Sequence, residues 1–311
     1  MFEQAIEFIK TGNFVEAEIL LLQLVSASPN DFDCLHMLGV VSGELSKLQQ
    51  AENCFSKAQS IDANYPPLYQ NWGLFLGKNN RYSEAVDKFT AAIRLAPNYP
   101  PIFSDRGCVL TKLGRHKEAL KDHDEAIRLA PNFAGFFNNR GNSLKADKQL
   151  TEALFNYDRA IQLLPNYADP FCGRGNVFTD LKRHDEAFAA YDKALSIKPD
   201  FAEAWLGRGN VFADLKRHDE AFAAYDKALS IKPDLAEAWL GRGNCFYDLK
   251  RYDEAFAAYD KALSIKPDLE NAWLGRGNCF YDLKRYDEAF AAYDKALSIK
   301  PDLAEAWLGR G

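Results

Sequence analysis

Histidine and cysteine are the side chains of this sequence best suited to bind a metal or to act as nucleophiles, and both are few. The chain holds five histidines and six cysteines among its 311 residues. No two cysteines form a Cys-x-x-Cys pair of the kind that binds zinc or exchanges disulfides. The cysteines are Cys34, Cys54, Cys108, Cys172, Cys245 and Cys279. We interpret them as reduced thiols.

The sequence repeats itself with a period of 34 residues, so residues that occupy the same place in different copies can be compared directly. The last two full copies differ only at Ala236/Glu270 and Glu237/Asn271. We predict a single array over 1–311, in which the final copy, 303–311, is truncated. The other copies are 1–30, 31–64, 65–98, 99–132, 133–166, 167–200, 201–234, 235–268 and 269–302.

Comparison between copies gives most histidines a packing role. His116, His184 and His218 share their place with tyrosines of other copies, and His123 stands where other copies have an aromatic residue. Only His36 lacks such a counterpart. Because no second ligand stands at a suitable spacing from any histidine, we predict no metal site.

Two other patterns suggest chemistry until their context is considered. Gly-Arg-Gly recurs at 207–209, 241–243 and 275–277, but inside a predicted helix rather than between a strand and a helix, so we reject nucleotide binding. Cys245 and Cys279 share their place with valines, as small core residues do. No Ser/His/Asp set and no carboxylate pair stands out from the periodic background. We therefore predict no catalytic residue and no cofactor, and we expect that this chain is not an enzyme.

Each copy is predicted to form two helices. Trp205, Arg208, Gly209 and Phe212 are spaced i, i+3, i+4, i+7, which places them on one face of a first helix over about 202–215. Since such a helix pair cannot bury its apolar face alone, each copy has to stack on its neighbours.

The second helix of the copy follows a turn at 216–218. Ala221, Tyr225 and Ala228 repeat at i, i+4 and i+7 and define its apolar face. We predict that this helix ends before Pro233, because the residue before a proline is pushed out of the helical region.

A family resemblance is carried by residues of both helices. They are Trp205, Gly209, Phe212, Ala221, Tyr225 and Pro233. At this spacing the chain resembles the tetratricopeptide repeat family over essentially all 311 residues. The resemblance implies an all-α fold, a right-handed superhelical solenoid of antiparallel helix pairs whose concave face is lined by the first helices and binds peptides or proteins. Arg208 stands where the family usually has leucine, which puts local packing in question.

The first helices carry a repeated polar pattern that is the candidate partner-binding surface. Asparagine and aspartate stand four residues apart, with leucine one turn earlier and tyrosine beside some of the aspartates. The residues of this ladder surface are Asn176, Asp180, Leu206, Asn210, Asp214, Leu240, Asn244, Tyr247, Asp248, Leu274, Asn278, Tyr281 and Asp282. One interpretation is that they bind a partner in the concave groove; the other is that they only keep an exposed face solvated. If they bind, the aspartates favour a basic or hydroxyl-rich extended segment.

Charge and hydropathy exclude several partner classes. The net charge is -6 with both signs interleaved, so no basic stripe exists to bind nucleic acid. No run of 18 apolar residues and no signal-like start occurs, so we expect no membrane insertion and a cytoplasmic location.

The C-terminal stub raises an alternative function. Gly311 lies halfway along a predicted first helix, so we expect that more protein follows it in a parent chain, and that the uncapped end can self-associate. The array also resembles those of bacterial relatives of protein O-GlcNAc transferase. We therefore predict a protein–protein interaction scaffold, with the substrate-recognition arm of a larger glycosyltransferase, whose catalytic domain is outside this chain, as the alternative.

Overall fold

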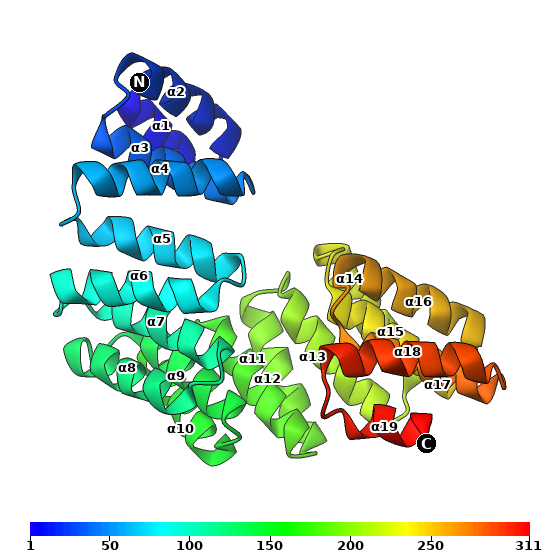
Figure 1. The fold of residues 1–311 in the computed structure, drawn as a ribbon. Coiled ribbons are helices and arrows are strands. Elements are labelled where there is room, and N and C mark those ends of the chain that lie inside the picture. The colour runs from blue at the N-terminus through cyan, green and yellow to red at the C-terminus, as the bar shows by residue number, and fades with distance from the viewer. The chain divides into compact units, whose positions relative to one another are not determined.

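The computed structural model describes residues 1–311 as nineteen α-helices without a strand, which confirms the all-α prediction (Figure 1). The chain divides into two compact units, Met1–Leu163 and Leu164–Gly311. The first unit holds α1 Phe2–Lys10, α2 Phe14–Ala27, α3 Phe32–Glu44, α4 Leu48–Ile61, α5 Pro66–Lys78, α6 Tyr82–Leu95, α7 Pro100–Lys112, α8 His116–Leu129, α9 Ala134–Ala146 and α10 Leu150–Leu163. The second holds α11 Ala168–Asp180, α12 His184–Ile197, α13 Ala202–Asp214, α14 His218–Ile231, α15 Ala236–Asp248, α16 Tyr252–Ile265, α17 Glu270–Asp282, α18 Tyr286–Ile299 and α19 Ala304–Arg310.

The odd-numbered helices are the first helices of the copies and are called A helices; the even-numbered ones are called B helices. Lys216, in the turn between α13 and α14, takes a left-handed φ of 58°. This allows the Arg217 N–H to donate to the Phe212 carbonyl at 2.9 Å, the long bond of a Schellman helix end. Helix B then begins at His218. The predicted helix of 202–215 is thus confirmed to within one residue.

In the A helices α13, α15, α17 and α19, a tryptophan forms a hydrogen bond with the turn that precedes the helix. The Trp205 indole N–H donates to the Pro199 carbonyl at 3.1 Å, and Trp239 repeats this contact with Pro233 at 3.3 Å. The prolines therefore end one copy and also provide a hydrogen-bond acceptor that orients the next.

Tyrosines of the B helices lie between two glycines in the second unit. Tyr225 is only 1% exposed, and a Cβ at Gly209 of its own copy would lie 2.5 Å from its ring. A Cβ at Gly241, on the next A helix, would lie equally close to the same ring. The Gly-Arg-Gly motif thus lies inside an A helix, as predicted, and its two glycines make room for the tyrosines of two successive copies.

The arginine between these glycines also has a packing role. The Arg208 guanidinium lies 5.2 Å from the centre of the Trp205 ring and pairs with Asp192 of the preceding B helix at 3.0 Å. It covers an aromatic ring while its charge meets a carboxylate, which explains how arginine replaces leucine at this place.

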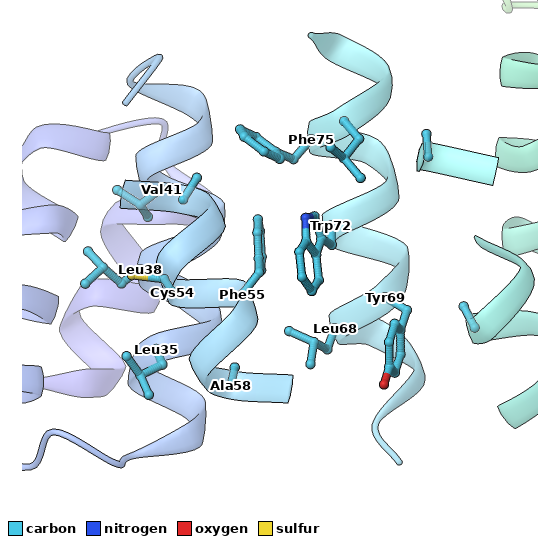
Figure 2. Close-up of a cluster of buried hydrophobic side chains, with 14 of the residues drawn as sticks. Leu35, Leu38, Val41, Cys54, Phe55, Ala58, Leu68, Tyr69, Trp72 and Phe75 are labelled. Carbon is cyan, nitrogen blue, oxygen red and sulfur yellow. The ribbon is translucent and has the colours of Figure 1, made fainter. Parts of the chain in front are cut away.

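In two copies of the first unit phenylalanine takes the place of the buried tyrosine, at Phe55 and Phe89. Phe55 on α4 is fully buried, and its ring stacks on Trp72 of α5 with centroids 5.7 Å apart (Figure 2). The ring centre of Phe75 lies 5.8 Å from that of Phe55. Neither unit contains a helix whose length and hydropathy would suit a membrane span.

Candidate partner-binding surface

The ladder surface lies on four A helices of the second unit, α11, α13, α15 and α17. Helix α13 contacts both α11 and α15, and α15 contacts α17, so these A helices are neighbours in space. The structure therefore brings the equivalent residues of successive copies side by side.

The asparagines of the ladder surface bond the buried tyrosines. Asn210 accepts a hydrogen bond from the Tyr225 hydroxyl through Oδ1 at 2.9 Å. The same bond joins Asn176 to Tyr191 at 2.8 Å, and it recurs in the next two copies. Each asparagine therefore satisfies a hydroxyl that burial has removed from water. Its Nδ2 group makes no hydrogen bond within the chain and is held in a fixed orientation.

This bond explains which copies carry asparagine. Where the B helix has phenylalanine or histidine instead of tyrosine, the A helix has no asparagine in the corresponding place. These pairs are Val40 with Phe55, Leu74 with Phe89, and Cys108 with His123. Asparagine appears first at Asn142, which accepts from the Tyr157 hydroxyl at 2.8 Å. The correlation was present in the sequence, but only the contact between the two places gives it meaning.

Two aspartates of the ladder surface are paired with lysines of the preceding copy. Lys182 Nζ lies 2.7 Å from Asp214, and Lys216 Nζ lies 2.8 Å from Asp248. Both lysines occupy the left-handed turn position that follows an A helix. Sequence reasoning missed these pairs, because the partners stand 32 residues apart and meet only when copies stack.

The leucines and tyrosines of the ladder surface differ in exposure. Leu206, Leu240 and Leu274 are half-buried and pack against the core clusters of their copies. Tyr247 is also half-buried, whereas Tyr281 is 49% exposed. The surface thus offers apolar contacts between its polar groups.

The histidines belong to the core or to the hairpin turns. His36, which had no counterpart in other copies, is buried, and its Nε2 lies 3.0 Å from Asn71 Nδ2. Burial lowers the pKa of His36 to about 4. His123 is buried beside the Ser143 hydroxyl at 2.8 Å, and burial together with the Arg140 charge lowers its pKa to about 4.

The cysteines are free, and five of the six are buried. Burial raises the pKa of Cys245 to about 11, so this thiol is un-ionised at neutral pH. No three His, Cys, Asp or Glu side chains lie close enough together to hold a metal ion.

The first unit contains a pocket that sequence reasoning did not find. Its volume is about 320 Å³, between α3 and α5, and its apolar wall includes Val40, Leu74 and Phe75. Glu44 and Lys78 form an ion pair of 2.7 Å at its edge. Comparison of copies places Val40 and Leu74 where later copies have the ladder asparagines, and Glu44 and Lys78 where they have the aspartates. In this part of the chain the places of the asparagines are therefore apolar, while the places of the aspartates hold an ion pair.

Comparison with protein families gives matches along most of the chain. Models described as tetratricopeptide repeat match residues 32–65, 101–133, 236–269 and 270–303. A model described as TPR repeat matches residues 141–181, 175–216 and 209–250. No curated protein matches the chain.

Two solved structures have a similar fold at 17% sequence identity. A tetratricopeptide repeat protein from Parabacteroides merdae aligns with 79% of this chain and 97% of its own chain, with a TM-score of 0.62. The structure of the APC/C hetero-tetramer Cut9-Hcn1 aligns with 95% of this chain and has a TM-score of 0.68. This chain spans 58% of the Cut9-Hcn1 chain that it matches. At this identity the likeness concerns the fold alone.

Proposed function

The chain belongs to the tetratricopeptide repeat family, and we propose that it is a protein–protein interaction scaffold that binds an extended segment of a partner along the ladder surface. The observation that carries this proposal is the recurrence of one amide, one carboxylate and one half-buried leucine on three neighbouring A helices, α13, α15 and α17. An extended chain presents its own groups at regular intervals, so a regular row of complementary groups suits it.

The fixed asparagines provide the polar part of such a site. The Tyr225 hydroxyl occupies Oδ1 of Asn210, so Nδ2 remains as a donor for a partner's backbone carbonyl. A donor that is already oriented loses little entropy when it binds. The aspartates support our proposal of a basic or hydroxyl-rich partner, which would bond the carboxylates beside their lysines.

The alternative, a recognition arm of a larger glycosyltransferase, stays a prediction without a specific observation in its favour. The asparagine ladder of that family is expected one turn earlier on the A helix, at the place of Gly241. Here a Cβ at Gly241 would lie 2.5 Å from the Tyr225 ring, so the place is filled by a neighbouring aromatic residue. The cytoplasmic location and self-association through the C-terminal end also stay predictions.

The test uses peptides selected from a displayed random library on the whole chain. We expect Asp214→Lys with Asp248→Lys to weaken binding of the selected peptides about tenfold or more, because two reversed charges and two longer side chains then obstruct the surface. The asparagines are left unchanged, since their loss would also remove the acceptors of buried hydroxyls.

The matched control makes the same charge change on the B helices. Asp226→Lys with Asp260→Lys also breaks two ion pairs between copies, those with Arg242 and Arg276. We expect this variant to bind the peptides as the wild type does. Equal loss in both variants, or no loss in the ladder variant, would contradict the proposal.

A further inference from the structure

Two adjacent copies carry tyrosines that the two copies directly before them lack. Tyr247 and Tyr281 stand near the ends of α15 and α17, where the copy of α13 has Ala213. Tyr252 and Tyr286 begin α16 and α18, where the two copies before them have histidine. The two places change together between these copies.

The paired tyrosines are in contact. The ring centres of Tyr247 and Tyr252 are 6.2 Å apart, and those of Tyr281 and Tyr286 are 5.5 Å apart in an edge-to-face arrangement. Tyr281 and Tyr286 are 49% and 47% exposed, so a large part of their surface is accessible to a ligand. Each pair therefore forms an aromatic corner between an A helix and the start of its B helix.

The carboxylate between the two corners has an unusual partner. Asp282 accepts a hydrogen bond from the Tyr252 hydroxyl at 3.2 Å, whereas Asp214 and Asp248 form ion pairs with lysines. Lys250, the equivalent lysine of this copy, makes no ion pair with Asp282. A phenol donates a hydrogen bond without adding a positive charge, so the charge of Asp282 is not neutralised by a cation.

The two arginines beside these corners are already paired with glutamates. Arg251 bonds Glu254 and lies over the Phe246 ring at 4.8 Å. Arg285 repeats this arrangement with Glu288 and the ring of Phe280. Burial and the nearby Asp282 carboxylate raise the pKa of Tyr247, so this phenol stays neutral and its ring face keeps its attraction for cations.

We infer that the tyrosine patch, Tyr247, Tyr252, Tyr281, Tyr286 and Asp282, binds arginine side chains of an extended basic segment in the partner protein. The guanidinium stacks on an exposed tyrosine face and pairs with the Asp282 carboxylate. Arginine suits the patch better than lysine, because its planar cation stacks on a ring and bonds a carboxylate at the same time. The inference rests on the proposed function and specifies the chemistry of the partner.

The variant that removes the tyrosine patch uses residues that an earlier copy of the same chain has at these places. Tyr247→Ala, Tyr252→His, Tyr281→Ala and Tyr286→His place the residues of the copy 201–234 in the two later copies. That copy forms helices with the same lengths as its neighbours, so the variant keeps the hairpins. The reverse change, Ala213→Tyr with His218→Tyr, adds an aromatic corner to the copy 201–234.

The probe is a fluorescein-labelled dodecapeptide of alternating serine and arginine, measured by fluorescence anisotropy on the whole chain at about 0.15 M salt, near physiological ionic strength. We expect the four-residue variant to weaken its binding roughly tenfold, as the loss of two cation–π contacts implies. We expect the added corner to strengthen binding severalfold. A serine–glutamine peptide should bind none of the three proteins.

Unchanged affinity of the arginine peptide for the four-residue variant, or equal binding of the serine–glutamine peptide, would overturn the inference. The ladder variant, Asp214→Lys with Asp248→Lys, separates this result from failure of the proposed function. If that variant loses the library-selected peptides while the tyrosine variant keeps the arginine peptide, only the tyrosine patch is wrong. If the selected peptides bind the ladder variant normally, the proposed function is wrong.

Discussion

From the hydrogen bond between Asn210 and Tyr225 we predict how substitutions at these two residues change the unfolding free energy. Tyr225 is 1% exposed, and its hydroxyl donates to Asn210 Oδ1 at 2.9 Å. Asn210→Val would leave this buried hydroxyl without an acceptor, which costs about 1–3 kcal/mol of unfolding free energy. Tyr225→Phe removes the hydroxyl itself and should cost about 0.5–1.5 kcal/mol.

The double variant gives the sharpest test of this coupling. Asn210→Val with Tyr225→Phe reproduces the pair Val40 and Phe55, which the chain already uses in its second copy. We expect its unfolding free energy to lie within about 1 kcal/mol of the wild type, because neither polar group is left without its partner. The two changes should therefore be coupled by roughly 1 kcal/mol or more.

The assay is urea unfolding of the whole chain followed by circular dichroism. Because a repeat array can unfold in parts, hydrogen exchange of the amides of α13 locates the effect in the changed copy. If the double variant costs as much as the two single variants added together, the two side chains are not coupled. That result would refute our explanation of why asparagine accompanies tyrosine.

Three other predictions concern packing, pH and thiol reactivity. Gly241→Ala should lower the urea midpoint, because a Cβ placed 2.5 Å from the Tyr225 ring costs about 1–3 kcal/mol in overpacking, more than alanine's gain in helix propensity of about 1 kcal/mol; an unchanged or higher midpoint would contradict this. His36 and His123 have folded pKa values of about 4, below the unfolded value of about 6.5, so the unfolded state binds more protons and the melting temperature should fall as the pH drops from about 6.5 to 4; His123→Tyr should reduce that fall, and an equal fall would count against the assignment. The Cys245 thiol should react with Ellman's reagent at neutral pH only after unfolding in urea, since burial raises its pKa to about 11; rapid reaction in the folded protein would show that it is accessible.

The helices were predictable because their signal is local and repeated. Spacings of three and four residues in the copy 201–234 placed the first helix over about 202–215, and the structure has it at Ala202–Asp214. The proline after the second helix also fixed its end, which lies at Ile231. Repetition then carried the same assignment through the other copies.

The contacts of the candidate surface were not predictable in the same way. Asn210 and Tyr225 stand 15 residues apart, and Lys182 and Asp214 stand 32 apart, so both pairs depend on how helices pack. The ladder residues could be chosen from their spacing, but not the fact that asparagine serves a buried hydroxyl. Gly241 shows the same limit, because its close neighbour, Tyr225, belongs to the preceding copy.

The most direct test of the proposed function is to locate a bound peptide by photo-crosslinking. A photoreactive benzoylphenylalanine is placed at Ala213, beside the ladder residues, where another copy accommodates Tyr247. The control places it at Ala223, an exposed position on the B helix of the same copy. We predict that peptides selected on the whole chain crosslink at position 213 and not at position 223. Crosslinking at position 223 alone, or binding without crosslinking at position 213, would contradict the account.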